Sequence, residues 1–406
     1  MPPIRQTQCC IAGGGPAGLM LGYLLARAGI ETVVLEKHGD FLRDFRGDTI
    51  HPSTMEALSR LGLLEEFLTL PHQKVRELSA RVGPDRVRVA EFSRLPVSAP
   101  YIAMMPQWDF LDFLARHAEA LPTFRLVRRT AATGLFLRDA RVAGVTAEGP
   151  DGPLRIEAPL CVAADGRGSV LRDSSELEIE DLGAPFDVLW FRLSRAETDG
   201  DETQGRFEAG RIAIAINRGS YWQCAFVVPK GGFEAIRAQG LPTFRAALSG
   251  VLPVDAARTD EIAGWDDVKL LNVQVNRLRR WWRPGFLAIG DAAHAMSPVG
   301  GVGVNLAIAD AVAAANLLVP AFRSGAPLDD TLAAVEARRA WPTRLVQRAQ
   351  VLAQERMLAP TLAARRPVRA PLALRLVTAL PPGRRLLGRM VGLGPRPEYP
   401  DPALFG

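Results

Sequence analysis

Cysteine is scarce in this chain of 406 residues, which contains only Cys9, Cys10, Cys161 and Cys224. Their spacing suits neither a zinc site nor a disulfide framework. Cys9 and Cys10 lie together in an apolar run, where small buried thiols are common. We therefore expect no metal site, and we interpret the cysteines as buried packing residues.

Lysine is equally scarce, and so arginine carries almost all of the formal net charge of +5. A basic balance can indicate a nucleic-acid partner. Here the arginines are scattered, and the sequence shows no helix-turn-helix, zinc finger or aromatic–basic platform. We therefore expect no nucleic-acid binding.

Long apolar runs are also missing, because Gly, Pro or a charged residue interrupts each one before the length of about 18 residues that a membrane-spanning helix needs. Residues 1–8 contain Arg5 and no leader-like apolar stretch. The sequence therefore predicts a cytoplasmic protein without a transmembrane helix or secretory signal. Its composition, 48% apolar and 23% charged, is that of a globular protein, and its length predicts two interlocked domains with an appendage.

The first forty residues predict a βαβ unit. Residues 8–12 form a short apolar strand, 13–18 a glycine turn and 19–28 a helix that Gly29 ends. Thr32–Leu35 forms a second strand, which ends in Glu36. A unit of this length opens a doubly wound sheet.

Two patterns alternate along the rest of the chain. Helices are expected at 52–68, 107–120 and 305–319, and buried strands at 160–164 and 286–289. An alternating hairpin at 76–96 and strands at 188–193, 212–216 and 222–228 indicate an antiparallel sheet. We predict an α/β fold with three parts: a discontinuous Rossmann-like nucleotide-binding domain (1–75, 97–180 and 273–355), an inserted, mainly antiparallel β-sheet substrate domain (76–96 and 181–272) and a C-terminal helical, basic appendage (356–406).

The glycine turn contains the pattern G-x-G-x-x-G between a strand and a helix. Glycine permits the tight turn, the approach of the backbone to a pyrophosphate and close helix–strand packing. The N-terminus of the next helix presents free N–H groups and a positive dipole end to phosphates. Glu36, eighteen residues after Gly18, is placed at a strand end to accept hydrogen bonds from a ribose. The predicted dinucleotide-binding residues of the turn are Gly13, Gly15, Pro16, Ala17 and Gly18.

Two further segments carry a resemblance to a known family. They read Cys161-Val-Ala-Ala-Asp165-Gly166-Arg-Gly168-Ser169 and Gly285-Phe-Leu-Ala-Ile-Gly290-Asp291-Ala-Ala-His294, the latter continued by Met296-Ser297-Pro298-Val-Gly300-Gly301-Val-Gly303-Val-Asn305-Leu306-Ala307. They resemble the signature segments of the FAD-dependent monooxygenases related to p-hydroxybenzoate hydroxylase. The resemblance covers most of residues 8–320 in the same order and spacing, and it implies FAD as cofactor with NAD(P)H as transient reductant.

The resemblance also implies roles for single residues. Glu36, with Lys37 beside it, would bind the adenosine ribose. Arg46 would lie near the pyrophosphate and help to receive NAD(P)H, and Gln107 would hold the ribityl and phosphate region. Asp165 matches the acid of the first signature segment.

In the second segment, Asp291, after Gly290, matches the acid that bonds a ribityl hydroxyl. The residues that would line the isoalloxazine are Pro298, Gly301, Gly303, Val304 and Asn305. Backbone N–H groups at a helix start, in a loop poor in Cβ atoms, stabilise the negative charge of a reduced flavin without a cation.

Two absences narrow the class. The sequence has no second G-x-G-x-x-G module, so NAD(P)H has no domain of its own, which argues against glutathione-reductase-like enzymes. It also lacks the paired-Trp segment and active-site lysine of the flavin-dependent tryptophan halogenases that share this fold. The resemblance then implies that reduced FAD reacts with O₂ to a C4a-hydroperoxide, which hydroxylates a largely apolar aromatic substrate such as a phenol, polyketide, quinolone or quinone.

No catalytic acid or base can be identified from the sequence. His294, Pro298 and His51 are candidates, although the family's motif gives a histidine at position 294 a helix-start role. The predicted strands of the antiparallel sheet supply candidates for substrate contact, although plain sheet packing explains them as well: Trp190, Arg192, Tyr221 and Gln223.

The C-terminal tail is unusually basic, since residues 356–396 contain nine arginines and no acid among Leu, Val, Met and Pro. A solvated helical appendage explains this composition. Closure of the substrate cavity and contact with an anionic membrane surface are the alternatives.

Two other functions remain open at this point. One is a reductase or dehydrogenase of the same fold that does not activate O₂. The other is a flavin-carrying protein that sequesters an aromatic ligand without turnover. The sequence does not reveal the oligomeric state.

Overall fold

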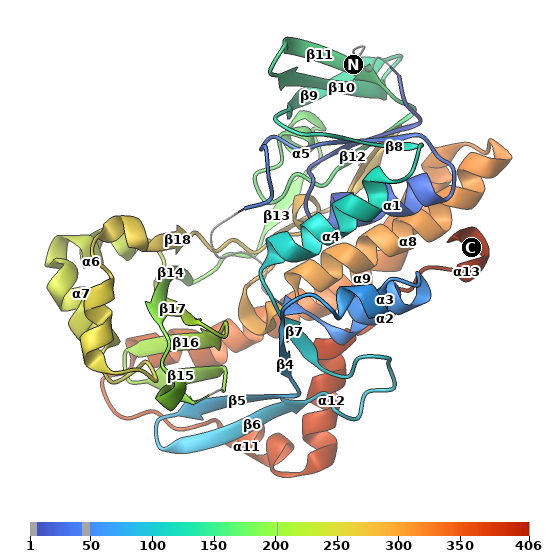
Figure 1. Ribbon diagram of the computed structural model, residues 1–406. Helices are drawn as coiled ribbons and strands as arrows, with labels where there is room; N and C mark the ends of the chain where they lie inside the picture. Colours follow the sequence, from blue (N-terminus) through green and yellow to red (C-terminus); the bar gives the residue numbers. More distant parts are fainter. Residues whose placement is uncertain (1–5, 43–48, 201, 406) are drawn as a thin grey trace.

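The computed structural model describes residues 6–42, 49–200 and 202–405. One of the two large sheets has six strands, which come from distant parts of the chain and lie in the order β20-β21-β12-β1-β2-β8 (Figure 1). Its strands are β1 (Cys9–Ala12), β2 (Thr32–Leu35), β8 (Phe124–Val127), β12 (Leu160–Ala163), β20 (Trp282–Arg283) and β21 (Phe286–Ala288). All neighbours pair in parallel except β20 with β21. The central strands are buried on both faces, which explains their unbroken apolar sequence.

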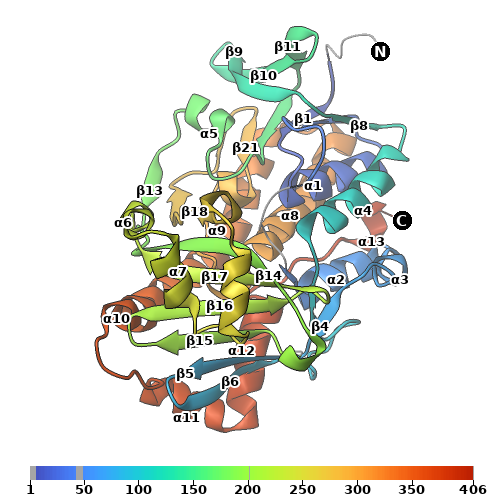
Figure 2. The ribbon, with the colours of Figure 1, turned by 60° about the vertical axis from the view of Figure 1, so that its left-hand side comes forward.

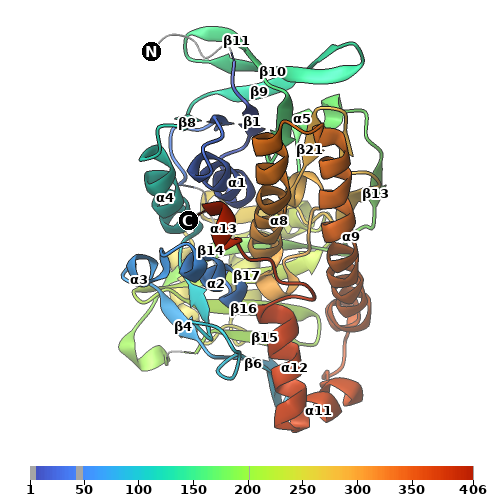
Figure 3. The ribbon, with the colours of Figure 1, turned by 90° about the vertical axis from the view of Figure 1, so that its right-hand side faces the viewer.

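Long helices cover this sheet. Helix α1 (Pro16–Arg27) packs against α4 (Gln107–Glu119) and α8 (Gly303–Ser324), and α9 (Leu328–Ala353) lies beside α8 (Figure 3). A three-stranded sheet formed by β9 (Ala131–Arg138), β10 (Arg141–Gly149) and β11 (Gly152–Glu157) lies beyond β12. Together these elements enclose the largest apolar core of the described residues.

Helix α8 bears on the expectation that no helix spans a membrane. Among the described residues, Val299–Ser324 is one helical stretch long and apolar enough to cross a membrane by length and composition, although Asp310 and Pro320 interrupt its apolar run. However, 72% of its most apolar window is buried inside the protein. The stretch is therefore the central helix of the core, packed between α1 and α9.

The second large sheet has seven strands, in the order β18-β14-β17-β16-β15-β5-β6 (Figure 2). Its strands are β5 (Glu77–Val82), β6 (Asp85–Glu91), β14 (Phe186–Ser194), β15 (Gln204–Glu208), β16 (Arg211–Asn217), β17 (Tyr221–Pro229) and β18 (Lys269–Leu271). The pairing is antiparallel except between β15 and β5. The segments 76–96 and 181–272 thus contribute to one sheet.

The two faces of this sheet have different neighbours. On the outer face, α6 (Phe233–Gln239) and α7 (Leu241–Leu248) cover Leu189, Phe191 and Leu193 (Figure 2). On the inner face, Val188 and Trp190 pack toward Val299 and Leu358, which belong to the loop before α8 and to the C-terminal region.

Short elements connect the two large sheets. A three-stranded antiparallel sheet has the order β3-β7-β4, formed by β3 (Thr49–Ile50), β7 (Ile102–Met104) and β4 (Gln73–Val75). Strand β13 (Ile179–Asp181) pairs with β19 (Asn276–Leu278) where the chain leaves and re-enters the six-stranded sheet. Helix α5 (Val170–Ser174) follows β12.

The C-terminal region begins where α9 continues into a π-helical turn, Gln354–Leu358, and then α10 (Ala359–Ala363). Helices α11 (Leu372–Ala379) and α12 (Pro381–Gly392) form a hairpin on β6, and α13 (Pro402–Phe405) returns to α8 (Figures 1 and 3). Helices therefore do follow residue 356, but the last segment is packed into the core.

Most of the predicted strands and helices are confirmed within one to three residues at each end, the last strand of the βαβ unit, Thr32–Leu35, without any shift. The helix predicted at 52–68 is instead two helices, α2 (Pro52–Arg60) and α3 (Leu64–Phe67), because Gly62 adopts a left-handed φ of 74° between them. The helix predicted at 305–319 is longer, since α8 continues through Pro320. The strands β9 to β11 were not predicted.

Candidate cofactor and substrate site

The glycine turn lies at the carboxyl end of β1. Gly13 has a φ of 104°, and a Cβ atom there would lie 2.3 Å from the Ala164 carbonyl oxygen. A Cβ atom on Gly18 would lie 1.9 Å from the Gly13 carbonyl oxygen. Helix α1 begins directly after Gly15 with Pro16 in its first turn, and it has no acidic residue and no capping side chain there. Its first N–H groups therefore remain available to an anion, with Ala17 and Gly18 in the first turn.

Glu36 lies at the adjacent strand end, where β2 finishes. It is buried, its Oε2 accepts a hydrogen bond from the Gly14 N–H at 3.0 Å, and its Oε1 accepts one from the His38 N–H at 3.0 Å. These bonds fix the carboxylate against the glycine turn. Lys37, the next residue, is exposed.

Asp165 follows β12, the strand on the other side of β1. Its carboxylate accepts hydrogen bonds from the Ser169 hydroxyl and from the Val170 N–H, the latter at 2.9 Å, and so caps α5. Burial raises the pKa of Asp165 above its usual value, although these hydrogen bonds oppose the shift. The hydrogen-bond partners of the Asp165 carboxylate therefore lie in its own segment. Its Cα lies against Gly13.

Asp291 follows β21, the next strand along. Its Oδ2 accepts a hydrogen bond from Arg167 Nη2 at 3.2 Å, so the two signature segments touch. Gly290 has a φ of 58°, and a Cβ there would lie 3.2 Å from the Cβ atoms of Ala17 and Ala307. The start of α1, the start of α8 and the end of β21 therefore converge.

The loop 298–305 connects this edge to α8. Gly300 and Gly301 have φ values of 82° and 62°, and the Gly301 carbonyl accepts a hydrogen bond from Thr49 Oγ1 at 2.9 Å. Pro298 starts the loop and Gly303 opens α8, with Val304 half-buried. The loop is thus fixed by β3 while its glycines keep its surface free of side chains.

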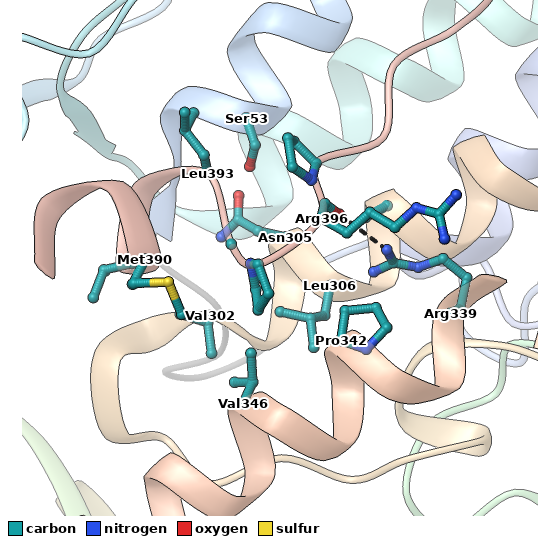
Figure 4. A pocket seen from close by; sticks show the side chains of 15 residues that line it. Ser53, Val302, Asn305, Leu306, Arg339, Pro342, Val346, Met390, Leu393 and Arg396 are labelled. Carbon is teal, nitrogen blue, oxygen red and sulfur yellow. Dashed lines mark hydrogen bonds between the residues drawn. The ribbon is translucent and has the colours of Figure 1, made fainter. Parts of the chain in front are cut away.

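Asn305 anchors the loop from inside α8. Its Oδ1 accepts hydrogen bonds from the His51 N–H at 2.9 Å and from Thr54 Oγ1 at 2.7 Å. Among the described residues, the buried Asn305 Nδ2 has no hydrogen-bond partner. Figure 4 shows Asn305 beside a cavity of about 30 Å³, which is also lined by Val302 and Leu306 of the same loop and helix and by residues of α9 and α12.

His51 is buried at the start of α2 and close to this loop. Its Nδ1 lies 2.9 Å from the Val391 carbonyl oxygen of α12. Burial lowers the pKa of His51 from its usual value to about 4, and the nearby carbonyls of Val391 and Gly301 only partly oppose that shift. The imidazole is therefore neutral near pH 7, and it joins the loop to the C-terminal hairpin rather than facing solvent.

His294 lies in a buried charge cluster. His294 Nε2 is 2.6 Å from Asp310 Oδ2, and Arg339 Nε is 2.8 Å from Asp310 Oδ1. Burial would raise the pKa of Asp310, but the attraction of His294 and Arg339 outweighs it and holds that pKa below its usual value. Asp310 Oδ2 also accepts the Gly290 N–H at 3.1 Å. This geometry favours a structural role for His294.

Two glutamines on α9, Gln347 and Gln350, bind backbone carbonyls of the segments that lead into the loop. Gln347 Nε2 donates to the carbonyls of Asn276 and Ala295, and Gln350 Nε2 donates to those of Ser297 and Val299 at 2.9 and 2.8 Å. Gln354 follows one turn later, in the π-helical segment, and is buried. Together with Asp310, these are site residues that the sequence analysis missed. The sequence feature that could have indicated them is a polar residue on an otherwise apolar helical face.

The four predicted substrate-contact residues share the inner face of the seven-stranded sheet. Arg192 of β14 is directly opposite Gln223 of β17, Trp190 is opposite Ala225, and Tyr221 is opposite Ser194. Directly opposed residues point to the same face. The Arg192 guanidinium lies 3.8 Å from the Tyr221 ring centroid, and Gln223 Oε1 accepts a hydrogen bond from Arg218 Nε at 2.9 Å.

Gln107 is the first residue of α4 and is partly buried. Arg46 lies outside the described residues. Within the described part of the chain, no group of three or more His, Cys, Asp or Glu side chains could hold a metal ion.

These residues fit an extended dinucleotide. Glycine at positions 13 and 18 creates a cradle that a Cβ atom would fill, Glu36 lies on one side of it at the end of β2, and Asp291 and the loop 298–305 lie on the other side. Strands β2, β1, β12 and β21 are adjacent and parallel, so their carboxyl ends bring all of these groups to one edge. The fold and this edge define a dinucleotide-binding flavoprotein.

Comparison with known proteins identifies the family. A model of the FAD binding domain family matches residues 6–349. The 6-methylpretetramide 4-monooxygenase of Streptomyces rimosus is 32% identical over 393 residues, which cover 95% of this chain and 92% of that protein. The chain spans only 60% to 64% of the length of several other curated relatives.

Solved structures of similar fold support the same family. The OxyS anhydrotetracycline hydroxylase from Streptomyces rimosus aligns with a TM-score of 0.73 at 25% identity, covering 97% of this chain and 77% of that one. PqsL, a probable FAD-dependent monooxygenase from Pseudomonas aeruginosa, aligns with a TM-score of 0.73 at 22% identity, covering 87% and 99%. The chain belongs to the FAD-binding family of aromatic flavoprotein monooxygenases, as the signature segments predicted.

Proposed function

We propose that this protein uses NAD(P)H and O₂ to hydroxylate a polycyclic phenolic substrate of the polyketide kind. The mixed α/β fold and the FAD-dependent monooxygenase family carry the general reaction. The narrower substrate class is supported by two relatives, whose names specify 6-methylpretetramide and anhydrotetracycline. FAD, once reduced, would supply the activation of O₂ and the transfer of one oxygen atom.

The single observation that carries the proposal is the meeting of three glycine–acid segments at one edge of the parallel sheet. In this proposal the Rossmann-like domain comprises 1–75, 97–180 and 273–355. The glycine turn binds the pyrophosphate, Glu36 the adenosine ribose and Asp291 the ribityl chain. The N–H groups after Gly301 then face the pyrimidine side of the flavin, where negative charge develops.

The substrate domain, 76–96 and 181–272, supplies the opposing wall. Trp190 packs with Ile214 and Val299, so an apolar wall faces the loop 298–305. An apolar wall excludes water from the reacting centre. Arg192, Arg218 and Gln223 add polarity on the same face, and a guanidinium there would stabilise a substrate phenolate. We assign no general base, since His51 and His294 are both buried in structural contacts.

The first test is the cofactor and the reaction. The purified protein should be yellow, release FAD on denaturation and be reduced by NADPH or NADH. Phenolic polyketides should accelerate that reduction, with substrate-dependent O₂ uptake and a product heavier by one oxygen atom in mass spectrometry.

Different failures separate the remaining functions. Accelerated reduction without O₂-dependent product would indicate a reductase of the same fold. A tightly bound aromatic that never accelerates reduction would indicate sequestration without turnover. A colourless protein that FAD cannot reconstitute would contradict the assignment of the edge itself.

A further inference from the structure

The hairpin formed by α11 and α12 exposes an unusual amount of apolar surface. Of the fourteen large apolar side chains that are exposed among the described residues, six lie between residues 372 and 390. Their exposed fractions range from 38% to 69%. We call them the hairpin surface: Leu372, Leu376, Val377, Leu380, Leu386 and Met390. Clustered exposure of this kind marks an interaction site more often than scattered exposure does.

Other side chains of the hairpin pack it against β6. Leu374 packs toward Val82 and Val87, and Leu387 packs with Phe92 in the next cluster. Glycine contacts close the hairpin: a Cβ on Gly383 would lie 1.8 Å from the Val377 carbonyl oxygen, and one on Gly388 would lie 2.0 Å from that of Glu91. The inner side is therefore filled and rigid, and the hairpin surface is additional to it.

The charge around this surface is predominantly positive. Residues 356–396 contain nine arginines and no acid. On the hairpin, Arg375, Arg385 and Arg389 are exposed between the apolar residues. Glu91 of β6 is the acid that approaches them, with its Oε2 3.6 Å from Arg385 Nε.

We propose that the hairpin surface docks onto an anionic lipid membrane. In an interfacial helix, leucines enter the boundary between headgroups and acyl chains, and the arginines that flank them contact lipid phosphates. The hairpin lies at an extremity of the molecule, at the end opposite the sheet formed by β9 to β11 (Figures 1 and 3).

A second copy of the chain fits this surface less well. A two-fold interface would bring the same patch of each copy together, so arginines would face arginines. Like charges at such distances destabilise an interface. An anionic bilayer instead complements every arginine at once.

The surface also lies close to the proposed substrate wall. Leu387 and Val391 of α12 pack in the same cluster as Met104 and Trp190. Docking would bring that wall near the membrane, which concentrates large apolar aromatics. The docking proposal does not depend on this consequence or on the catalytic assignment.

The test is flotation of the full-length FAD-loaded protein with vesicles. With equal parts of phosphatidylglycerol and phosphatidylcholine, the protein should rise with the vesicles at low salt and less at high salt. With phosphatidylcholine alone it should remain largely at the bottom. Protein that stays at the bottom with the anionic vesicles overturns the proposal.

Paired variants identify the surface responsible. Leu376→Ser and Leu380→Ser should each weaken vesicle partitioning roughly tenfold, since each removes an exposed apolar side chain that docking would bury in the membrane. Arg375→Glu and Arg385→Glu should weaken it by at least about fivefold each. The matched controls, Leu137→Ser and Arg125→Glu, change an exposed leucine of β9 and an exposed arginine of β8, and they should float as the unchanged protein does.

Three outcomes would reassign the surface. Equal flotation of the hairpin and control variants would place lipid contact elsewhere. A dimer in size-exclusion chromatography that dissociates on Leu376→Ser would make a second copy the partner. Binding of polyglutamate, but not of vesicles, through the same arginines would indicate an acidic protein.

Discussion

The six-stranded and the seven-stranded sheets both contribute to the site, but they constrain the sequence by different means. The edge of the six-stranded sheet depends on backbone geometry. A Cβ atom on Gly13 or Gly18 would collide with a backbone carbonyl, Gly290 has a left-handed φ in tight surroundings, and acids follow the strand ends. Few residue types satisfy such positions.

The inner face of the seven-stranded sheet depends on apolar side chains instead. Trp190, Ile214 and Ile216 fill it together with residues from distant segments. Many combinations of apolar residues fill the same volume at similar cost. The comparison suggests that the cofactor edge tolerates little change, whereas the substrate wall can diversify, and four predictions test this.

The largest effect is expected from Asp310→Asn, beneath the cofactor edge. The change removes the nearer of the two carboxylates beside the buried Arg339, since Glu398 Oε1 still lies 3.7 Å from Arg339 Nη1, and breaking a buried ion pair costs up to about 3–5 kcal/mol. Chemical unfolding should show this loss at pH 7. Glu202→Gln is the matched control, because it breaks an exposed pair with Arg86 and should cost at most about 1 kcal/mol.

The same variant has a pH signature. The folded-state pKa of Asp310 lies below that of an unfolded aspartate, about 3.9, so its stabilisation is complete above that value. It is lost as the pH falls through the folded-state pKa. The difference between the unchanged protein and Asp310→Asn should therefore narrow only in strong acid, and a difference that already vanishes at pH 6 would contradict the charge assignment.

The second prediction concerns the cradle itself. In Gly13→Ala the new Cβ meets the Ala164 carbonyl at a φ that disfavours L residues. A strain of about 3 kcal/mol would weaken FAD binding roughly 100-fold. Fluorescence titration of the FAD-free protein measures this. Gly168→Ala is the control, because nothing lies within 4 Å of its Cβ position, and its affinity for FAD should not change.

The third prediction uses His51, beside the loop 298–305. Its folded-state pKa of about 4 lies below the unfolded value near 6.5, so the unfolded chain binds more protons between these values. The free energy of unfolding should fall by up to about 3 kcal/mol as the pH drops from 6.5 to 4. His51→Gln should show a smaller fall over that range and no change in slope between pH 7 and 8. Identical slopes in both proteins would show that another group titrates.

The same contrast explains what could be predicted from the sequence. The βαβ unit and the three glycine–acid segments could be predicted because backbone conformation restricts the residue types there. The inward face of Trp190, Arg192, Tyr221 and Gln223 could be expected from strand periodicity alone.

Contacts between residues far apart in the sequence could not be predicted in the same way. Nothing local indicates that Asp310 pairs with Arg339, or that α9 presents Gln347 and Gln350 to the loop, since these partners lie 29 to 53 residues away. Asp165 adds a contact that its motif did not indicate, because its carboxylate also accepts N–H groups at the start of α5. Tertiary structure decides which partner a polar side chain finds.

The smallest effect is expected on the substrate wall. Trp190→Ala removes an aromatic ring that packs in two apolar clusters of the inner face, while the edge that binds FAD is untouched. We expect roughly a tenfold rise in KM for the best polyketide substrate, which corresponds to about 1.4 kcal/mol of binding, with little change in flavin content. Trp190→Phe should restore most of the loss, because an apolar ring still fills the wall.

Trp265→Ala is the matched control on the other face of the same sheet. Trp265 packs against Phe233 and Phe244 under α6 and α7, so its loss should lower the Tm without raising KM. If both tryptophan variants changed KM alike, the effect would come from destabilisation of the sheet. If Trp190→Ala instead abolished FAD binding, the wall and the cofactor edge would be one constrained unit, and the contrast between the two sheets would fail.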